Sequence, residues 1–212
     1  MNTCYIVCAL DCKVNIKPKE GDFIIGADRG YQVLQKNKIE PNLAIGDFDS
    51  CDGKLEAEKV IRYPVKKDYT DSELAIMHAI ELGYKKIQVW GAIGGNLDHT
   101  IANLALLAKY TEQGIDISFV DGEKIAFAIN NSSACFSAKA EGRISVFSAV
   151  DKAFGVSEKG LLYELDNKTL ESSTPLGVSN EFVAKDATIS VQKGTLIIYT
   201  DKKNYEKHLT RK

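Results

Sequence analysis

Short apolar runs alternate with polar segments over the first 125 residues of the chain. The runs lie at 4–10, 22–27, 43–45, 60–63, 86–90 and 115–120. Such runs are typical of strands that are buried on both faces of a parallel sheet. Helical spacing of apolar positions predicts helices at 31–38, 54–59, 70–83 and 101–108. The alternation predicts an α/β domain with a mostly parallel, doubly wound sheet.

The pattern changes after the polar segment at 130–133. Short apolar runs now recur between glycines and polar turns, at 143–147, 161–165, 182–184, 188–191 and 196–199. Hairpin turns are predicted at 159–160, 166–168 and 192–194. Few helical stretches remain, which indicates an antiparallel β-sandwich or barrel, and we expect a C-terminal antiparallel β-sandwich domain. We therefore expect two domains, at residues 1–130 and 131–212.

Composition excludes several classes of protein. The net charge is −2, with 27 basic and 29 acidic residues and no basic stripe, so nucleic acid is not expected as a partner. No apolar run reaches the roughly 20 residues that span a bilayer, so no membrane association is expected. The N-terminus lacks a secretory leader, and an odd count of 5 cysteines indicates reduced thiols. A cytoplasmic location is expected, with Cys4 and Cys8 packed in or beside a core strand rather than binding zinc.

Two aspartates follow the apolar run at 43–45. If the backbone stays extended, Asp47 and Asp49 point to the same side, and two hard oxygen ligands at one strand end suit Mg²⁺. An ordinary acidic turn is the alternative interpretation. A second acidic cluster, with Asp68 and Asp71, favours a site.

The second acidic cluster lies at a predicted helix start. Thr70 and Glu73 form a capping box, which exposes the free N–H groups of the first turn. The glycine segment at 91–100 joins a strand to a helix, an arrangement that offers backbone N–H groups to phosphate. His99 in this segment is the only histidine expected to be functional. Because ligands of such sheets lie beyond the carboxyl ends of the strands, these polar clusters should converge on one edge.

The predicted chemistry is metal-assisted phosphoryl-type transfer. The sequence has no Walker A motif, protein-kinase signature or nucleophilic triad. Positioning and charge neutralisation dominate such transfer. One rival is a haloacid-dehalogenase-like phosphatase, with Asp47 as nucleophile and Asp49 as acid/base. A non-catalytic nucleotide-binding module is another.

Successive motifs of the chain resemble those of the thiamine pyrophosphokinase family. They are Asp28-Arg29-Gly30, Gly46-Asp47-Phe48-Asp49-Ser50, Lys67-Asp68-x-Thr70-Asp71, Gly94-Gly95-Asn96-Leu97-Asp98-His99 and Gly177-Val178-Ser179-Asn180-Glu181-Phe182. The resemblance implies transfer of the terminal diphosphate of ATP to the hydroxyl of thiamine, giving thiamine diphosphate and AMP. It also implies a homodimer whose active site lies between the subunits.

The resemblance implies a role for each matching residue. Mg²⁺ would be held by Asp47, Asp49 and Asp71. The nucleotide would be bound by Asp28, Arg29, Lys67, Thr70, Gly94, Gly95, Asn96, Asp98 and His99. Thiamine would be contacted by Ser179 and Asn180 of the partner, and the catalytic carboxylates would be Asp71, Asp68 and Asp49. Asp71 or Asp68 is the candidate acceptor of the hydroxyl proton.

Some assignments stay open on the sequence. Asn96 stands where the family usually has an arginine, so Arg29 or Lys67 would have to supply that charge. Tyr69 or Phe182 is the candidate for aromatic contact with the cationic ring of thiamine. A pyrophosphokinase of another small alcohol, such as a pterin, is the alternative.

Overall fold

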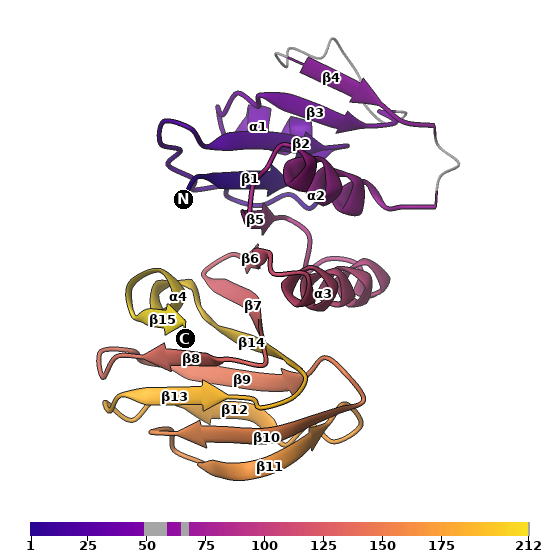
Figure 1. Ribbon diagram of the computed structural model, residues 1–212. Helices are drawn as coiled ribbons and strands as arrows, with labels where there is room; N and C mark the ends of the chain where they lie inside the picture. Colours follow the sequence, from indigo (N-terminus) through magenta and orange to yellow (C-terminus); the bar gives the residue numbers. More distant parts are fainter. Residues whose placement is uncertain (49–58, 65–67, 212) are drawn as a thin grey trace. The chain divides into compact units, whose positions relative to one another are not determined.

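The computed structural model describes residues 1–48, 59–64 and 68–211 (Figure 1). The chain forms two compact units. The first unit contains Met1–Leu106 and Gly114–Gly122, and the second contains Leu107–Gln113 and Glu123–Lys212. Two predicted site residues, Asp49 and Lys67, lie outside the described residues, as does the predicted helix at 54–59 apart from its last residue.

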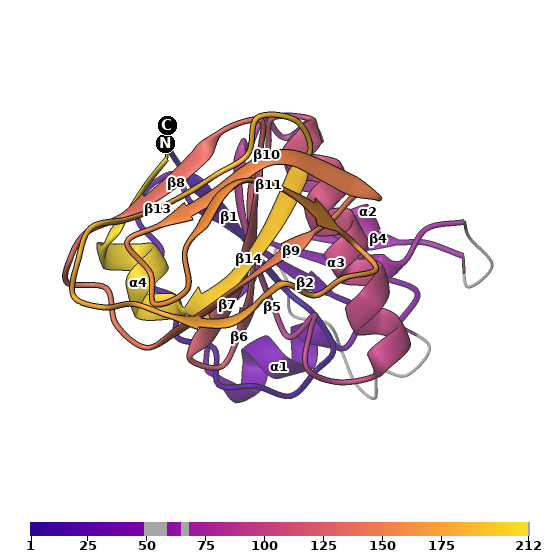
Figure 2. The same cartoon turned by 90° about the horizontal axis from the view of Figure 1, so that it is seen from below.

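The first unit is an α/β fold built on parallel strands. Its elements are β1 (Thr3–Val7), β2 (Phe23–Ala27), α1 (Gly30–Lys36), β3 (Leu43–Gly46), β4 (Lys59–Arg62), α2 (Asp71–Glu81), β5 (Lys86–Trp90), α3 (Leu97–Glu112) and β6 (Asp116–Asp121). The strands lie in the order β6-β5-β1-β2-β3-β4, and every neighbouring pair is parallel. Helices α1 and α2 lie on opposite faces of this sheet (Figures 1 and 2). The predicted parallel α/β arrangement is confirmed.

The central strands are apolar because both of their faces are covered. Ile6, Ile25, Ile45 and Ile87 are fully buried, and each such side chain contributes about 1.5–3 kcal/mol. Trp90 at the end of β5 is also buried. Strand β4 at the edge of the sheet is mostly exposed and carries charged residues, which discourage pairing with another chain.

The chain reverses its direction of travel across the sheet at β1. From β1 it proceeds to β2, β3 and β4 on one side, and then returns through α2 to β5 and β6 on the other side. Strand β1 ends earlier than predicted, at Val7, so that residues 8–10 run beyond the sheet. Cys8 N donates to Trp90 O at 2.8 Å, and Leu10 N donates to Gly91 O at 3.2 Å. The segment after β1 therefore lies beside the end of β5.

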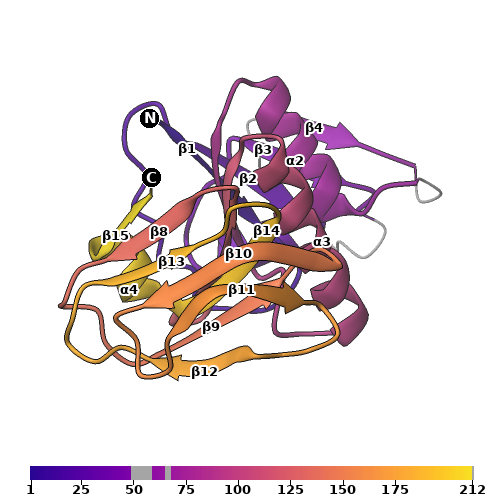
Figure 3. The ribbon, with the colours of Figure 1, turned by 60° about the horizontal axis from the view of Figure 1, so that its bottom comes forward.

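The second unit is antiparallel. Its elements are β7 (Lys124–Asn130), β8 (Ser133–Phe136), β9 (Arg143–Ser148), β10 (Lys152–Lys159), β11 (Leu165–Glu171), β12 (Gly177–Glu181), β13 (Ala187–Ser190), β14 (Thr195–Asp201), α4 (Lys202–Lys207) and β15 (Leu209–Arg211). The strands form two sheets, β12-β9-β14-β7 and the five-stranded β11-β10-β13-β8-β15 (Figure 3). One hydrophobic core contains residues of both sheets, among them Phe127, Ile144, Val156 and Ile189.

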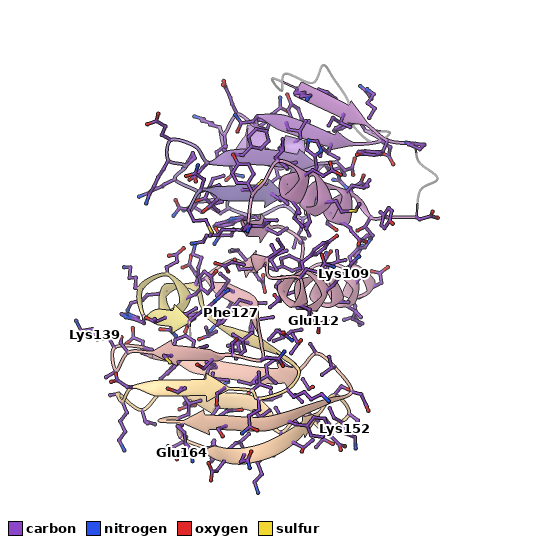
Figure 4. The ribbon with its side chains drawn as sticks, viewed as in Figure 1. Lys109, Glu112, Phe127, Lys139, Lys152 and Glu164 are labelled. Carbon is purple, nitrogen blue, oxygen red and sulfur yellow. The ribbon has the colours of Figure 1, made fainter. Side chains whose placement is uncertain are left out.

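Pairing with β14 decides where the second unit begins. Strand β7, which carries Phe127 (Figure 4), pairs with β14 along its whole length, from Asn130 opposite Thr195 to Lys124 opposite Asp201. The long segment of the second unit therefore begins at Glu123, directly before β7.

The turns of the second unit follow the sequence only in part. The predicted hairpin turn at 159–160 is confirmed, since β10 ends there and pairs with β11. A turn at 192–194 is also present, but it joins β13 to β14, which lie in different sheets, so it is not the predicted hairpin. The predicted turn at 166–168 is wrong, because these residues are within β11, and the predicted strand at 161–165 is mostly the connection before it. Most residues of β11 are polar and exposed, so no apolar alternation marks it.

No helix among the described residues is both long and apolar enough to cross a membrane.

Candidate active site

A pocket of about 410 Å³ opens in the first unit at the carboxyl ends of β1, β2 and β5. Its lining residues are Cys8, Ala9, Leu10, Ala27, Asp28, Arg29, Thr70, Asp71, Ser72, Gly91, Ala92, Gly95, Asn96, His99 and Asn103. This is the point where the strand order reverses, and ligands of open α/β sheets bind there. Of the clusters predicted to converge, those at 28–29 and 91–99 meet at this pocket, joined by Thr70 and Asp71 of the cluster at 68–71. Asp47 of the cluster at 47–49 does not line the pocket, and Asp49 lies outside the described residues.

The start of α2 brings a carboxylate into the pocket. Thr70 has an extended backbone (φ −70°, ψ 157°), and its side-chain oxygen accepts a hydrogen bond from Glu73 N at 3.2 Å. This confirms the predicted N-cap and places Asp71 in the first turn, where the helix dipole favours negative charge. Burial and then the charge of Asp71 raise the pKa of the Cys8 thiol to about 12. Cys8 is therefore a neutral packing residue and not a nucleophile.

Asn103, which was not among the predicted site residues, links three segments around the pocket. Its side chain is 4% exposed, donates to Ala92 O at 2.6 Å and accepts from Ser72 Oγ at 2.9 Å. These bonds tie α3 to the segment after β5 and to the first turn of α2. The sequence pattern that could have identified Asn103 is its spacing from Leu106 and Leu107, which places a polar residue on the buried face of the helix.

The segment after β5 needs glycine at two positions. Gly91 has φ 66° and Gly94 has φ 89°. A Cβ at Gly91 would lie 2.7 Å from Leu10 O, and one at Gly94 would lie 2.8 Å from Asp121 Oδ1. The left-handed backbone and these close approaches both exclude larger residues. The result is a bare backbone segment at one wall of the pocket.

Helix α3 starts earlier than the sequence predicts. Asn96 O accepts hydrogen bonds from Thr100 N and Thr100 Oγ1, both at 3.0 Å, so that the helix begins at Leu97. Asp98 and His99 therefore belong to its first turn and not to a loop. Gly95, Asn96 and His99 line the pocket, whereas Gly94 and Asp98 do not.

A left-handed turn after β2 places Asp28 and Arg29 at the pocket. Asp28 has φ 48°, its N donates to Ile45 O at 2.7 Å, and its O accepts from Tyr31 N at 3.1 Å. Gly30 follows, where a Cβ would lie only 1.8 Å from Val7 O. Glycine at this position lets α1 begin directly against the end of β1.

Asp47 follows β3 at the same edge of the sheet but does not line the pocket. The next residue, Phe48, has φ 55° and is buried in a cluster with Tyr31 and Ala44. The Arg62 guanidinium lies 5.3 Å from the centre of the Phe48 ring. The condition under which Asp47 and Asp49 would point to the same side, an extended backbone between them, is therefore not met at Phe48.

Carboxylate oxygens are the metal-binding groups that the pocket offers. Asp28 and Asp71 line it, and such hard oxygen donors suit Mg²⁺. Within residues 1–48, 59–64 and 68–211, no group of three or more His, Cys, Asp or Glu side chains is arranged to hold a metal ion. Asp68 is exposed and outside the pocket lining. The donor chemistry fits a divalent cation, and Asp49, the remaining predicted ligand, lies outside the described residues.

The predicted thiamine contacts lie in the second unit, on β12. The register of β12 against β9 shifts between Gly177 and Asn180. Between them Ser179 has φ 59°, is exposed, and donates its N–H to Ser145 Oγ at 3.0 Å. Asn180 by contrast is buried, with 4% exposure. The two neighbours thus differ in what they can offer to a ligand.

An α/β unit with an acidic, glycine-walled pocket at its switch point is typical of enzymes that act on phosphorylated small molecules. Comparison with known families identifies the particular family. The chain matches the model of the thiamin pyrophosphokinase catalytic domain over residues 17–119 and that of the thiamin pyrophosphokinase vitamin B1 binding domain over residues 137–196. The chain belongs to the thiamin pyrophosphokinase family, as its motifs predict.

Individual relatives agree with this membership. The chain is 30% identical to a thiamine pyrophosphokinase of Bacillus subtilis over 181 residues, which cover 82% of this chain and 85% of the relative. A crystal structure of thiamine pyrophosphokinase from Bacillus subtilis superposes with a TM-score of 0.81 at 27% identity, covering 94% of this chain and 98% of the other. The crystal structure of a thiamin pyrophosphokinase family protein from Enterococcus faecalis superposes with a TM-score of 0.82 at 25% identity, covering 94% of this chain and 98% of the other.

Proposed function

We propose that the chain transfers the terminal diphosphate of ATP to the hydroxyl of thiamine with the help of Mg²⁺, giving thiamine diphosphate and AMP. In this proposal the first unit is a doubly wound nucleotide-binding domain, and the second is a β-sandwich that binds thiamine. The pocket at the ends of β1, β2 and β5 carries the proposal, since it combines an acidic helix start with a glycine segment beside the start of α3.

The nucleotide phosphates would bind at Gly95, Asn96 and His99. Backbone N–H groups at the first turn of α3 attract anions, and the 16-residue helix adds its dipole. Asn96 brings no charge, but Arg29, which also lines the pocket, does. Arg29 is therefore the cation that would take over the function of the arginine usual at position 96.

Mg²⁺ would be held by Asp47, Asp49 and Asp71. When bound, it would neutralise the β- and γ-phosphates. Asp71 is the stronger candidate to accept the proton of the thiamine hydroxyl, because it lines the pocket and Asp68 does not. Asp71 is half-buried at the start of α2, and its carboxylate would accept the proton while the new ester bond forms.

A homodimer would bring the thiamine-binding strand of a partner to this pocket. Large apolar side chains on the second unit are exposed, including Phe147 on β9, Val178 on β12 and Tyr163 in the connection between β10 and β11. Exposed apolar side chains on adjoining strands support an interface with a second copy. Ser179, exposed on β12, would be the residue of this strand that contacts thiamine.

The test is release of AMP from Mg-ATP with and without thiamine. We expect AMP only when thiamine is present, and none when EDTA removes the metal. Phosphate release without thiamine would instead indicate the phosphatase, and AMP release with a pterin alcohol but not with thiamine would indicate another acceptor. Either result would refute the proposal.

Asp71→Asn tests the catalytic role directly. We expect kcat to fall by about 100-fold or more, with little change in the KM for ATP, because the amide cannot accept the proton. Asp68→Asn should have a smaller effect, and Glu81→Gln at the exposed far end of α2 is the matched control. Unchanged turnover in both aspartate variants would remove the proposed role.

A further inference from the structure

Strand β10 carries a carboxyl group into the core of the second unit. Glu158 is 0% exposed, and it follows the fully buried Val156 at the two-residue spacing of one strand face. Among the described residues no other Asp or Glu side chain is buried. A buried acid usually needs a specific partner, and this one has a partner on β12.

That partner is Asn180. Its Nδ2 donates to Glu158 Oε2 at 3.0 Å and to Tyr163 O at 2.7 Å. Its Oδ1 accepts from Tyr163 N at 3.0 Å and from Glu181 N at 2.9 Å. A carboxamide offers two donor hydrogens and two acceptor lone pairs, so all of them are used within the chain. Asn180 has no hydrogen-bonding group left for a ligand.

The Glu158–Asn180 pair encloses the irregular part of β12. The register shift lies between Gly177 and Asn180, and Ser179 within it has a left-handed backbone. On the other side of the irregularity, a Cβ at Gly177 would lie 3.0 Å from Glu158 Oε1 and 2.6 Å from Val146 O. Glu158 therefore packs against Gly177 and bonds Asn180, the two residues that flank the segment containing Ser179.

Stability alone does not account for a buried glutamate here. Among the described residues, Glu158 Oε1 has no hydrogen-bond partner, and replacing such a group by an apolar side chain of similar size is often neutral or stabilising. The feature that distinguishes this carboxyl group from an apolar side chain is the hydrogen bond that it accepts from Asn180. This bond ties β10 to β12 and to the connection that contains Tyr163.

We propose that Glu158 is a positioning residue for thiamine binding, which acts by fixing Asn180 and thereby the bulge that presents Ser179. The inference rests on the proposed function. It assigns Asn180 to the internal framework of the site and leaves direct contact with the vitamin to its neighbours.

The test compares Glu158→Leu with Glu158→Gln. The leucine variant loses the acceptor for Asn180, and we expect the KM for thiamine to rise about tenfold or more, while kcat and the KM for ATP stay within about twofold. The glutamine variant keeps an acceptor oxygen and should stay within about twofold of wild type throughout. The control is Glu171→Gln, which removes a carboxylate of the same hairpin that pairs with Lys152 at the surface. An unchanged thiamine KM in Glu158→Leu, or an equal rise in both KM values, would overturn the inference.

A second pair of variants keeps the test decisive if Glu158→Leu does not fold. Asn180→Asp retains the acceptors for Tyr163 N and Glu181 N but loses the donors and sets two carboxyl groups against each other. We expect a raised KM for thiamine, largely restored by adding Glu158→Gln, which returns a donor to the pair. Failure of the second substitution to restore it would contradict the proposed coupling.

Direct binding separates this inference from the proposed function. If wild-type protein releases no AMP with thiamine, the proposed reaction is refuted, and calorimetric titration with thiamine then compares the same variants. Weaker binding in Glu158→Leu but not in Glu158→Gln would still support the positioning role. Equal binding in both variants would overturn it, and absence of thiamine binding in the wild type would overturn both proposals.

Discussion

The buried carboxyl of Glu158 should make the stability of this chain depend on pH near neutrality. Burial raises the pKa of Glu158 from its ordinary value of 4.5 to about 7, although the hydrogen bond from Asn180 acts in the opposite direction. The folded state therefore binds a proton that the unfolded state releases over this range. Stability from this group is fully present below the unfolded pKa and is lost as the pH rises through the folded pKa.

The magnitude follows from the two pKa values. A change from 4.5 to about 7 corresponds to about 3 kcal/mol of unfolding free energy, lost as the pH rises to about 8. Domains of this kind are stable by about 5–15 kcal/mol in total, so the effect is a large fraction of the whole. Replacing Glu158 by glutamine removes the titration while keeping the size of the side chain and the acceptor for Asn180.

Urea denaturation followed by far-ultraviolet circular dichroism measures this difference. Between about pH 5 and about pH 8, wild-type stability should fall relative to Glu158→Gln by about 3 kcal/mol, and Glu171→Gln should follow the wild type. Fluorescence of Trp90, which lies in the first unit, shows whether both units unfold in one transition. Parallel pH profiles for wild type and Glu158→Gln would refute the reasoning.

Three further variants test the first unit. Gly30→Ala should lower the free energy of unfolding by about 3 kcal/mol, since the added Cβ would lie 1.8 Å from Val7 O. The control is Gly114→Ala, where nothing lies within 4 Å. It should lower the free energy of unfolding by only about 1 kcal/mol, because alanine is strained at the positive φ of this position. Equal losses in urea titrations would contradict this. Thr70→Ala should lower the free energy of unfolding by about 1 kcal/mol, because the hydrogen bond from Glu73 N is lost. An unchanged midpoint of urea denaturation would argue against the cap. Asn96→Arg should lower the KM for ATP several-fold by adding a fixed charge beside the phosphates, and a raised KM would show that Arg29 already supplies it.

The first unit could be predicted from the sequence because its signals are local. Unbroken apolar runs identified β1, β2, β3 and β5, and Thr70 with Glu73 identified the start of α2. The parallel order then placed the polar strand ends on one edge. The inward turn of Phe48 could not be predicted, because it depends on tertiary packing. Phe48 packs in a cluster with Tyr31, a contact between residues far apart in the sequence that no local pattern indicates.

The second unit was harder to predict because its strands are irregular. Gly155 has φ 65°, and the register of β10 against β11 shifts on both sides of Val156. The buried Ala153 and Val156 lie three residues apart, so the apolar alternation that would have identified β10 is broken between them, and the inward-facing Glu158 was not recognised. Asn180 was predicted to contact thiamine from its place in a motif, and only the four hydrogen bonds of its carboxamide identify it as a buried link.

The end of α3 has a practical consequence for dissecting the molecule. Leu107–Gln113 belong to the second unit although they precede the last strand of the first. Glu112 Oε1 accepts a hydrogen bond from the buried Thr195 Oγ1 at 2.5 Å, and Leu107 is fully buried. A gene fragment that begins at codon 123 would encode the C-terminal sheets without this segment of their own unit. Recombination between relatives should therefore exchange Leu107–Gln113 together with the C-terminal sheets.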